Sequence, residues 1–226
     1  NGNCISSHQR FCILFNAFRN TLSYNINMDT ENRVIVGISG ASGAILASKM
    51  IDTLIDNDFG VSVVASGPSR MVWQQEMEES FGESIERWSD HNKFEIFPIG
   101  DFTAPIASGS YPSKGMIIVP CSMATVSAIS AGLSDNLIRR AADVCLKEKR
   151  KLVIVPRESP LNVIHLDNLS NLAKIGVTIL PSDPPYYLGI KTLEQSAEVL
   201  AQKSLVALGL SDELPENMQY TGPQKK

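Results

Sequence analysis

Small and polar residues gather at three points of this 226-residue chain where a buried strand is expected to give way to a helix. They are the segments GISGASG (37–43), PCSMAT (120–125) and PRESP (156–160). In the first, small residues would let the backbone approach a ligand closely, and the N-terminus of the helix that follows favours a phosphate. Its GxxGxxG spacing, with no acidic residue closing the next strand, favours a mononucleotide over NAD. Glycines at such a turn also serve packing, and both interpretations stay open.

The second segment offers hydroxyl groups. Ser122 and Thr125 stand at the start of a helix, where a hydroxyl either caps the helix or donates to a flavin or a phosphate. Cys121 precedes them, but no histidine lies near it in the sequence to act as its base. We therefore do not expect a catalytic cysteine.

Charged residues distinguish the third segment. Arg157 and Glu158 form either a surface ion pair of little energetic weight or, in a cleft, a phosphate-holding arginine beside a proton-transferring carboxylate. On the helix expected before them, Arg140 and Lys147 lie two turns apart on one face. That face is either an anion-binding surface on an acidic protein or an ordinary solvated one.

The surrounding pattern predicts the elements that would position these segments. Strands that are apolar throughout, alternating with helical stretches, predict a parallel sheet covered on both faces. We expect a single Rossmann-like or flavodoxin-like α/β domain of three layers, with a mostly parallel, doubly wound sheet. The strands are expected at 34–39, 61–66, 115–120, 151–156 and 177–181, with an irregular excursion over 82–113.

Capping signals set the limits of the later helices. Ser159 followed by Pro160 predicts a helix that runs from there to about residue 174. Thr192 with Gln195 predicts a capping box for the last helix. The apolar face of that helix is expected to hold Leu193, Ala197, Leu200, Ala201 and Leu208.

The composition of the chain excludes several classes of binding partner. Twenty basic residues against 24 acidic ones give a formal charge of −4, which argues against general binding to nucleic acid or an anionic membrane. No run reaches the roughly 18 apolar residues that a membrane span needs. His8, His91 and His165 are scattered and predict no metal site, and His165 is expected to pack within a helix. Four cysteines without CxxC pairs predict a reduced compartment, with the cytoplasm as the expected location.

Residues 1–27 differ from the rest, with no acidic residue, two arginines and six asparagines. Two interpretations stay open: a targeting presequence, which would place the protein in the mitochondrial matrix, or upstream-translated or vector-derived sequence before a natural start at Met28. Either way we expect this segment to lie outside the fold. One domain is expected over 28–210, followed by a polar tail over 211–226.

In this order and spacing, GISGASGA, ASGSY, VPCSM, DNLIRRAADVCLKEKRKLVIVPRESPL, IHLDNL and PPYY resemble the flavin prenyltransferase family, called UbiX in bacteria. The resemblance covers roughly residues 33 to 210 and is most specific from AADVCLKE to VPRE. It implies a metal-independent transferase that joins the dimethylallyl group of dimethylallyl phosphate to N5 and C6 of reduced FMN. The product, prenylated FMN, would serve a separate UbiD-type decarboxylase, in ubiquinone biosynthesis or aromatic acid decarboxylation.

The resemblance also implies roles for single residues. The catalytic positions are Glu158, with the proton-transfer role, Glu76 and Phe102. FMN would contact Gly40, Ala41, Ser42, Ser66, Ser122, Met123, Thr125 and Arg140. The donor would be bound by Lys147, Arg157, Tyr187 and Lys203. The aromatic faces of Phe102 and Tyr187 would stabilise the allyl cation. Phe102 stands where some members have tryptophan, and Lys203 where an arginine is common, so a point charge replaces a bidentate fork.

The same resemblance implies a homo-oligomer, a trimer or a dodecamer, with FMN at subunit interfaces, so that Glu76 and Tyr187 can serve a neighbour's flavin. No aspartate-rich DDxxD metal motif occurs, and lysine and arginine can neutralise a monophosphate in place of Mg²⁺. Two alternatives remain. A related FMN-dependent decarboxylase of cysteine-type substrates would use a catalytic histidine and an asparagine at the second segment, which here reads PCSMAT. A non-catalytic flavin-binding regulator would need no Glu158.

Overall fold

The computed structural model describes residues 32–220 and 222, so the expectations for residues 1–27 lie outside the described residues. Its centre is a sheet in the order β3-β2-β1-β4-β5-β6, in which every neighbouring pair is parallel. This is the Rossmann strand order, and it reverses between β1 and β4. The strands are β1 (Arg33–Ile38), β2 (Gly60–Ala65), β3 (Phe94–Phe97), β4 (Gly115–Cys121), β5 (Lys151–Pro156) and β6 (Thr178–Ile179).

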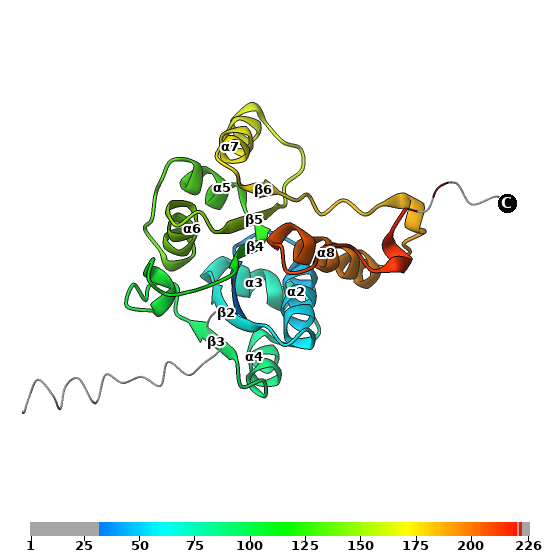
Figure 1. Ribbon diagram of the computed structural model, residues 1–226, viewed down its shortest axis with the longest axis horizontal. Helices are drawn as coiled ribbons and strands as arrows, with labels where there is room; N and C mark the ends of the chain where they lie inside the picture. Colours follow the sequence, from blue (N-terminus) through cyan, green and yellow to red (C-terminus); the bar gives the residue numbers. More distant parts are fainter. Residues whose placement is uncertain (1–31, 221, 223–226) are drawn as a thin grey trace, which may run out of the picture.

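Helices cover both faces of this sheet (Figure 1). One face carries α2 (Ala44–Asp56), α3 (Gly67–Glu76), α4 (Phe81–Ser89) and α8 (Leu193–Leu208), and the other carries α5 (Met123–Ser130), α6 (Leu137–Lys147) and α7 (Val163–Lys174). Two separate clusters of buried apolar residues result, one on each face. The expected three-layer α/β domain is therefore confirmed.

Strand β1 shows why a continuous apolar run suits this position. Val34, Val36 and Ile38 pack into the core beneath α2 and α8, whereas Ile35 packs into the core on the α6 side. Because side chains alternate between the two faces of a strand, a strand buried on both faces needs apolar residues at every position.

The expectation of an irregular excursion over 82–113 is wrong in part. This stretch begins within α4, which starts with a capping box between Ser80 and Glu83, and it contains the edge strand β3. The strand has four residues and every one is only half-buried, so it lacks the long apolar run that marks the central strands. The amphipathic helix is anchored by a fully buried Trp88 instead.

The helix limits differ from expectation in two places. Helix α7 begins at Val163 rather than at Pro160, because Asn162 supplies the cap and the half-buried ring of His165 contacts it from the third helical position. Helix α8 has the expected capping box, but Leu193 is 72% exposed and lies outside its buried face. The last strand is also shorter than 177–181.

The tail after residue 210 has structure of its own. It contains the short helix η4 (Glu216–Met218), and the Gln219 side chain donates to the carbonyl oxygen of Leu214 at 2.8 Å. Tyr220 then packs edge to face against Tyr187, at 5.5 Å between ring centroids. Tyr187 lies on η3 (Tyr186–Leu188), in the arm that leads from β6 to α8 and projects from the domain (Figure 1).

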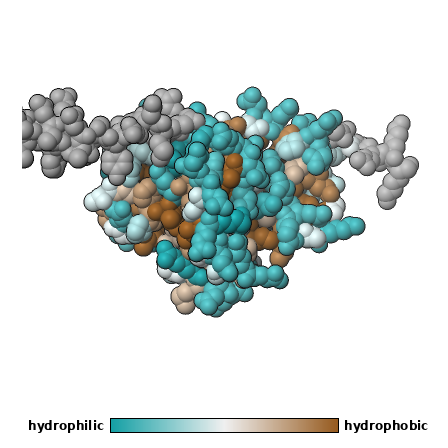
Figure 2. Space-filling view, turned by 90° about the horizontal axis from the view of Figure 1, so that it is seen from below, coloured by the Kyte–Doolittle hydropathy of each residue, from teal (hydrophilic) through white to brown (hydrophobic). Residues whose placement is uncertain are grey.

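The surface is mixed. Figure 2 shows a mostly hydrophilic face interrupted by apolar areas. Among the exposed large apolar side chains, three lie on α7: Val163, Ile164 and Leu166, with exposures of 69, 63 and 53%. No helix in the described part of the chain is long and apolar enough to cross a membrane.

Candidate active site at the carboxyl ends of the strands

The first and second polar segments meet where the strand order reverses. Ser39, directly after β1, donates through its backbone N–H and its hydroxyl to the carbonyl oxygen of Pro120, at 3.2 and 3.1 Å. The same hydroxyl accepts from the N–H of Ser122 at 2.7 Å. Ser39 is buried and was not among the expected site residues. Its signal in the sequence was only a polar residue closing an apolar strand.

Two further hydrogen bonds join the neighbouring strand ends to this point. The N–H of Ser66, after β2, donates to the carbonyl oxygen of Ile38 at 2.9 Å. The N–H of Arg157, after β5, donates to the carbonyl oxygen of Cys121 at 3.1 Å. The ends of β2, β1, β4 and β5 thus form one continuous rim, as expected for the ligand-binding edge of a parallel sheet.

Two glycines of this rim hold positions that a larger residue would not fit. A Cβ atom on Gly40 would lie 2.5 Å from Cβ of Pro68, because the first segment passes against the start of α3. Gly43 has a φ of 117°, in the left-handed region that favours glycine, and it is the N-cap of α2. Gly43 has no side chain with which to cap the helix.

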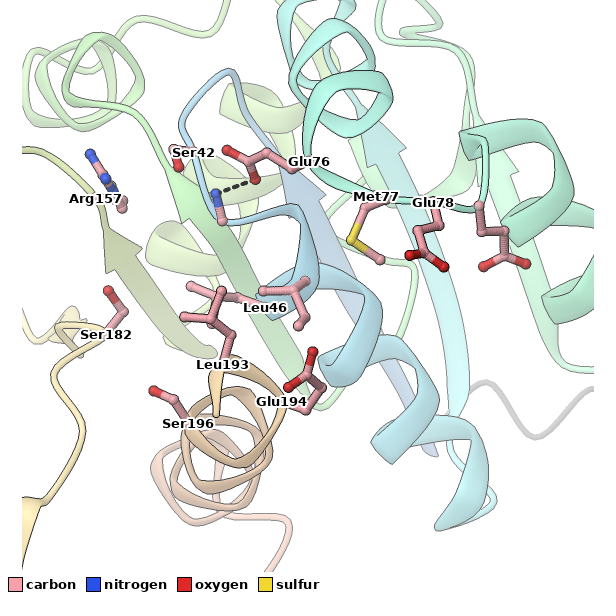
Figure 3. A pocket seen from close by; sticks show the side chains of 13 residues that line it. Ser42, Leu46, Glu76, Met77, Glu78, Arg157, Ser182, Leu193, Glu194 and Ser196 are labelled. Atoms are coloured by element: carbon pink, nitrogen blue, oxygen red, sulfur yellow. Dashed lines mark hydrogen bonds between the residues drawn. The ribbon is translucent and has the colours of Figure 1, made fainter. Parts of the chain in front are cut away.

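Glu76 supplies the missing cap. It is the last residue of α3, and its Oε2 accepts from the backbone N–H groups of Gly43 and Ala44, both at 2.8 Å (Figure 3). Burial opposes ionisation of this carboxyl. Hydrogen bonds from Ser42, Ala44 and Gly43, together with the charge of Arg157, outweigh the burial and hold the pKa of Glu76 below its ordinary value. The α2 N-terminus, where a phosphate site was one expectation, is therefore occupied by the chain's own carboxylate.

A groove of about 830 Å³ opens beside this carboxylate. It lies between the first turn of α2, the end of α3 and the first turn of α8 (Figure 3). In the same view Arg157 lies at the left, on the other side of Ser42 from Glu76. The volume lies within the range of small-molecule sites, roughly 300–1,000 Å³. The lining residues are Ser42, Gly43, Ile45, Leu46, Glu76, Met77, Glu78, Glu79, Arg157, Ser182, Leu193, Glu194 and Ser196.

A second, smaller groove of about 370 Å³ shares Arg157 with the first. Glu158 and Ser159 line it, together with residues of the segment after β6. The carboxylate of Glu158 is exposed and accepts from the N–H of Ser159 at 3.0 Å. Arg157 and Glu158 therefore lie in a cleft region at a strand end. They do not form the ion pair that was the simpler interpretation of their sequence.

The hydroxyl groups of the rim serve as helix caps. Ser66 caps α3 by accepting from the N–H of Ser69, and Ser122 caps α5 by accepting from the N–H of Thr125. Thr125 and Met123 are buried, at 6 and 7% exposure. Helix capping, one of the two roles left open for these hydroxyls, is thus observed. The first-turn N–H groups of α3 and α5 face the rim, where they suit an anion.

The two basic residues of α6 expected to bind ligand, Arg140 and Lys147, are each ion-paired with an acidic neighbour, as is the third, Arg139. Arg140 contacts Asp143 at 2.8 Å and donates to the carbonyl oxygen of Ala107 at 3.0 Å. Lys147, at the last position of α6, contacts Glu148. Since α6 leads into β5 and the two run in opposite directions, Lys147 lies toward the amino ends of the strands. One chain does not bring it to Arg157.

Three other expected site residues also lie away from the first groove. Phe102 follows β3 in a surface loop and is 48% exposed. Tyr187 lies on the projecting arm and is 59% exposed. Lys203 lies on α8, about two and a half turns beyond the groove residue Glu194. The chain thus brings together Gly40, Ala41, Ser42, Ser66, Glu76, Ser122, Arg157 and Glu158, but not Phe102, Lys147, Tyr187 and Lys203.

The two cysteines in the described part of the chain do not offer a nucleophile. Cys121 and Cys145 are both buried, and burial raises the pKa of both thiols, that of Cys145 to about 12. A thiol with such a pKa is protonated at neutral pH. Within residues 32–220 and 222, no group of three or more His, Cys, Asp or Glu side chains could hold a metal ion.

FMN fits the rim by its chemistry. The close approach at Gly40, the helix starts of α3 and α5, and the adjoining groove together give backbone donors for a phosphate and room for a ring system. A model of the family described as Flavoprotein matches residues 22–201.

Comparison with known proteins identifies a narrower group within this family. The chain is 43% identical over 190 residues to the flavin prenyltransferase UbiX of Halalkalibacterium halodurans, covering 79% of this chain and 89% of that one. It is 41% identical over 192 residues to UbiX of Chlamydia pneumoniae, covering 85 and 99%.

Solved structures agree. A dodecameric FMN-dependent UbiX-like decarboxylase from Escherichia coli O157:H7 matches with a TM-score of 0.77 at 36% identity, over 84% of this chain and all of that one. AnUbiX, in complex with FMN and dimethylallyl pyrophosphate, matches with a TM-score of 0.78 at 32% identity, over 86 and 100%. With the family model, the relatives and the fold in agreement, this chain belongs to the flavoprotein family and, within it, to the flavin prenyltransferases called UbiX.

Proposed function

We propose that the groove beside Glu76 and Arg157 is where this flavin prenyltransferase joins the dimethylallyl group of dimethylallyl phosphate to reduced FMN. One observation carries the proposal. A chain about two-fifths identical to UbiX proteins places the carboxylate of Glu76, the hydroxyl of Ser42 and the guanidinium of Arg157 around one groove at the strand-order reversal. Reduced FMN, when bound, supplies the nucleophilic N5 and the ring carbon C6.

Each residue of the rim then has a task. Arg157 lines both grooves and would hold the donor's phosphate by charge-assisted hydrogen bonds. Glu158 is exposed to the second groove, and its free carboxylate oxygen would take the proton that must leave the flavin. Ser42 and Glu76 would hold the flavin edge from the α2 side. Stabilisation of the departing phosphate by fixed positive charge needs no metal ion.

The remaining substrate residues would come from a second subunit. Lys147 and Tyr187 lie at the far end of α6 and on the projecting arm, so one chain cannot place them beside its own Arg157. The exposed apolar side chains of α7 (Val163, Ile164 and Leu166) and Tyr186, which is 88% exposed, offer contact area for other copies of the chain. A relative in the same family is dodecameric, which supports an oligomer in which neighbours complete each site, whether trimer or dodecamer. Glu76, in contrast, serves the groove of its own chain.

We further propose that prenylated FMN made here passes to a UbiD-type decarboxylase, and that the protein acts in the cytoplasm. Exposed residues line both grooves, among them Glu194 in the first and Glu158 and Ser159 in the second, which supports release of a flavin product to another protein. The thiols of Cys121 and Cys145 are free, which suits a reduced compartment.

The test is anaerobic incubation of the protein with reduced FMN and either dimethylallyl monophosphate or diphosphate, followed by mass spectrometry of the flavin. The proposal predicts a flavin that gains one C5 unit with at least one donor. A peptide ending in cysteine is incubated in parallel with oxidised FMN. Loss of its carboxylate, with no change in the flavin of the first reaction, would establish the cysteine decarboxylase alternative instead.

A further inference from the structure

The turn that follows Glu76 is held by three donors. The Trp73 indole donates to the backbone carbonyl oxygen of Glu79 at 3.1 Å, and the Ser84 hydroxyl donates to its carboxylate at 2.9 Å. Arg87, on α4, completes the set with a two-pronged contact, from Nε to Oε1 and from Nη2 to Oε2 of Glu79, both at 3.1 Å. These contacts fix a segment that begins one residue after the carboxylate capping α2.

Arg87 also binds α2 itself. Its Nη1 contacts Oδ1 of Asp52 at 2.7 Å, and the indole of Trp88 donates to the same oxygen at 2.7 Å. Asp52 lies about two turns after Ala44, on the helix whose first amides Glu76 caps. One guanidinium therefore joins the turn that follows Glu76 to α2, the helix whose N-terminus Glu76 caps.

We infer that Arg87 is a positioning residue for Glu76: it holds the turn 77–80 against α2, so that the Glu76 carboxylate stays on the Gly43 and Ala44 amides at the edge of the groove. A single ion pair at this exposure contributes little to stability. The contribution of Arg87 is instead geometric, because its planar guanidinium binds the carboxylates of Glu79 and Asp52 at once and so fixes the turn relative to α2. Without the guanidinium, the carboxylates of Asp52 and Glu79 would repel each other and the turn would separate from α2.

Hydrogen exchange in the flavin-free protein tests this position directly. The first-turn amides of a helix have no partner within the helix, so protection at Gly43 and Ala44 reports the Glu76 contact. We expect Arg87→Met to raise exchange at these two amides about tenfold, since both hydrogen bonds weaken when the turn moves. Arg87→Lys, which keeps the charge but not the fork, should restore part of the protection.

Lys49→Met is the matched control. It removes another ion pair of α2, that with Glu198 at 3.3 Å, at a place that does not touch the turn, and exchange at Gly43 and Ala44 should stay as in the wild type. Glu79→Gln serves as a second variant should Arg87→Met fail to fold, because it weakens the same contact from the other side. Unchanged protection in Arg87→Met or Glu79→Gln would overturn the inference.

The catalytic consequence rests on the proposed function. We expect Arg87→Met to lower kcat about tenfold while KM for the donor changes by less than about twofold, and to cost no further activity in a Glu76→Gln background. A full additional loss in that background would show that Arg87 acts by another route. If the wild type makes no prenylated flavin, the proposed function fails, while the exchange result still decides whether Arg87 positions Glu76.

Discussion

Glu76 shows how one side chain links fold and chemistry. It ends α3, caps α2 through two backbone amides and borders the groove beside Ser42 and Arg157. The family resemblance marked Glu76 for the site, but only the structure shows its contact with a helix N-terminus. That contact depends on the angle between α2 and α3, which a local pattern does not encode.

The capping role of Glu76 makes stability depend on pH. Its folded-state pKa is depressed below the ordinary 4.5, so its stabilisation is fully present above that value and is lost as the pH falls through the folded pKa. We expect Glu76→Ala to lower the free energy of unfolding by about 1 kcal/mol at pH 7, and the difference from wild type to shrink below pH 4.5. Urea unfolding of both proteins at several pH values measures this difference.

Glu86→Ala, an exposed change on α4 away from any helix N-terminus, provides the comparison for that experiment and should change the free energy of unfolding at pH 7 by less than about 0.5 kcal/mol. If Glu76→Ala lowers the free energy of unfolding by the same amount at pH 7 and well below pH 4.5, the ionised carboxylate is not what stabilises the helix.

At the scale of elements, the site depends on how closely the strand ends approach one another. The sequence allowed prediction of all four central strands and their polar junctions, because long apolar runs and small residues are local signals. It did not allow prediction of β3 or α4. The four residues of β3 form an edge strand that is stabilised by a distant partner, since Glu95 pairs with the buried Arg33 of β1 at 3.1 Å.

Gly40→Ala tests the close approach of the first segment to α3. The new methyl group would lie 2.5 Å from Cβ of Pro68, so the rim must shift. We expect FMN affinity to fall about tenfold, in line with roughly 1–3 kcal/mol for overpacking. Gly82→Ala, whose Cβ would have its nearest neighbour at 3.9 Å, is the control, and fluorescence titration of FMN is the measurement. Equal affinities of the two variants would mean that the rim does not bind the flavin.

Glu95→Gln tests the edge-strand contact. It leaves the guanidinium of Arg33, 1% exposed, without its counter-charge, and we expect a loss of about 2 kcal/mol in the free energy of unfolding. Asp58→Asn alters an ion pair whose acid is 78% exposed, and its effect should stay within about 0.5 kcal/mol. Similar losses in both variants would show that burial of Arg33 does not set the strength of its pair.

At the scale of the whole molecule, the proposed function requires that one chain forms only part of a site. The motifs of the sequence indicate all the substrate residues, yet neither composition nor spacing says which of them share a subunit. Lys147 lies before the start of β5 and Arg157 directly follows its end, so the length of β5 separates the two residues within one chain.

Mixed oligomers test this division. Glu158→Gln and Lys147→Met chains should each be inactive alone. When co-expressed in equal amounts, they should regain about a quarter of the wild-type activity, because that share of sites receives Glu158 from one chain and Lys147 from another. Prenylation rates of the purified mixture give the result. No recovery, in an assembly shown to contain both chains, would place both residues in one subunit's site.

The most direct measurement is a single anaerobic turnover with reduced FMN and dimethylallyl phosphate, followed by the mass of the flavin over time. The account predicts that the wild type adds one C5 unit and that Glu158→Gln does so about 10²- to 10⁴-fold more slowly, the range for loss of a proton-transfer group. Glu86→Gln should match the wild type. A Glu158→Gln protein that prenylates FMN at the wild-type rate would contradict the assignment of the reaction to this rim.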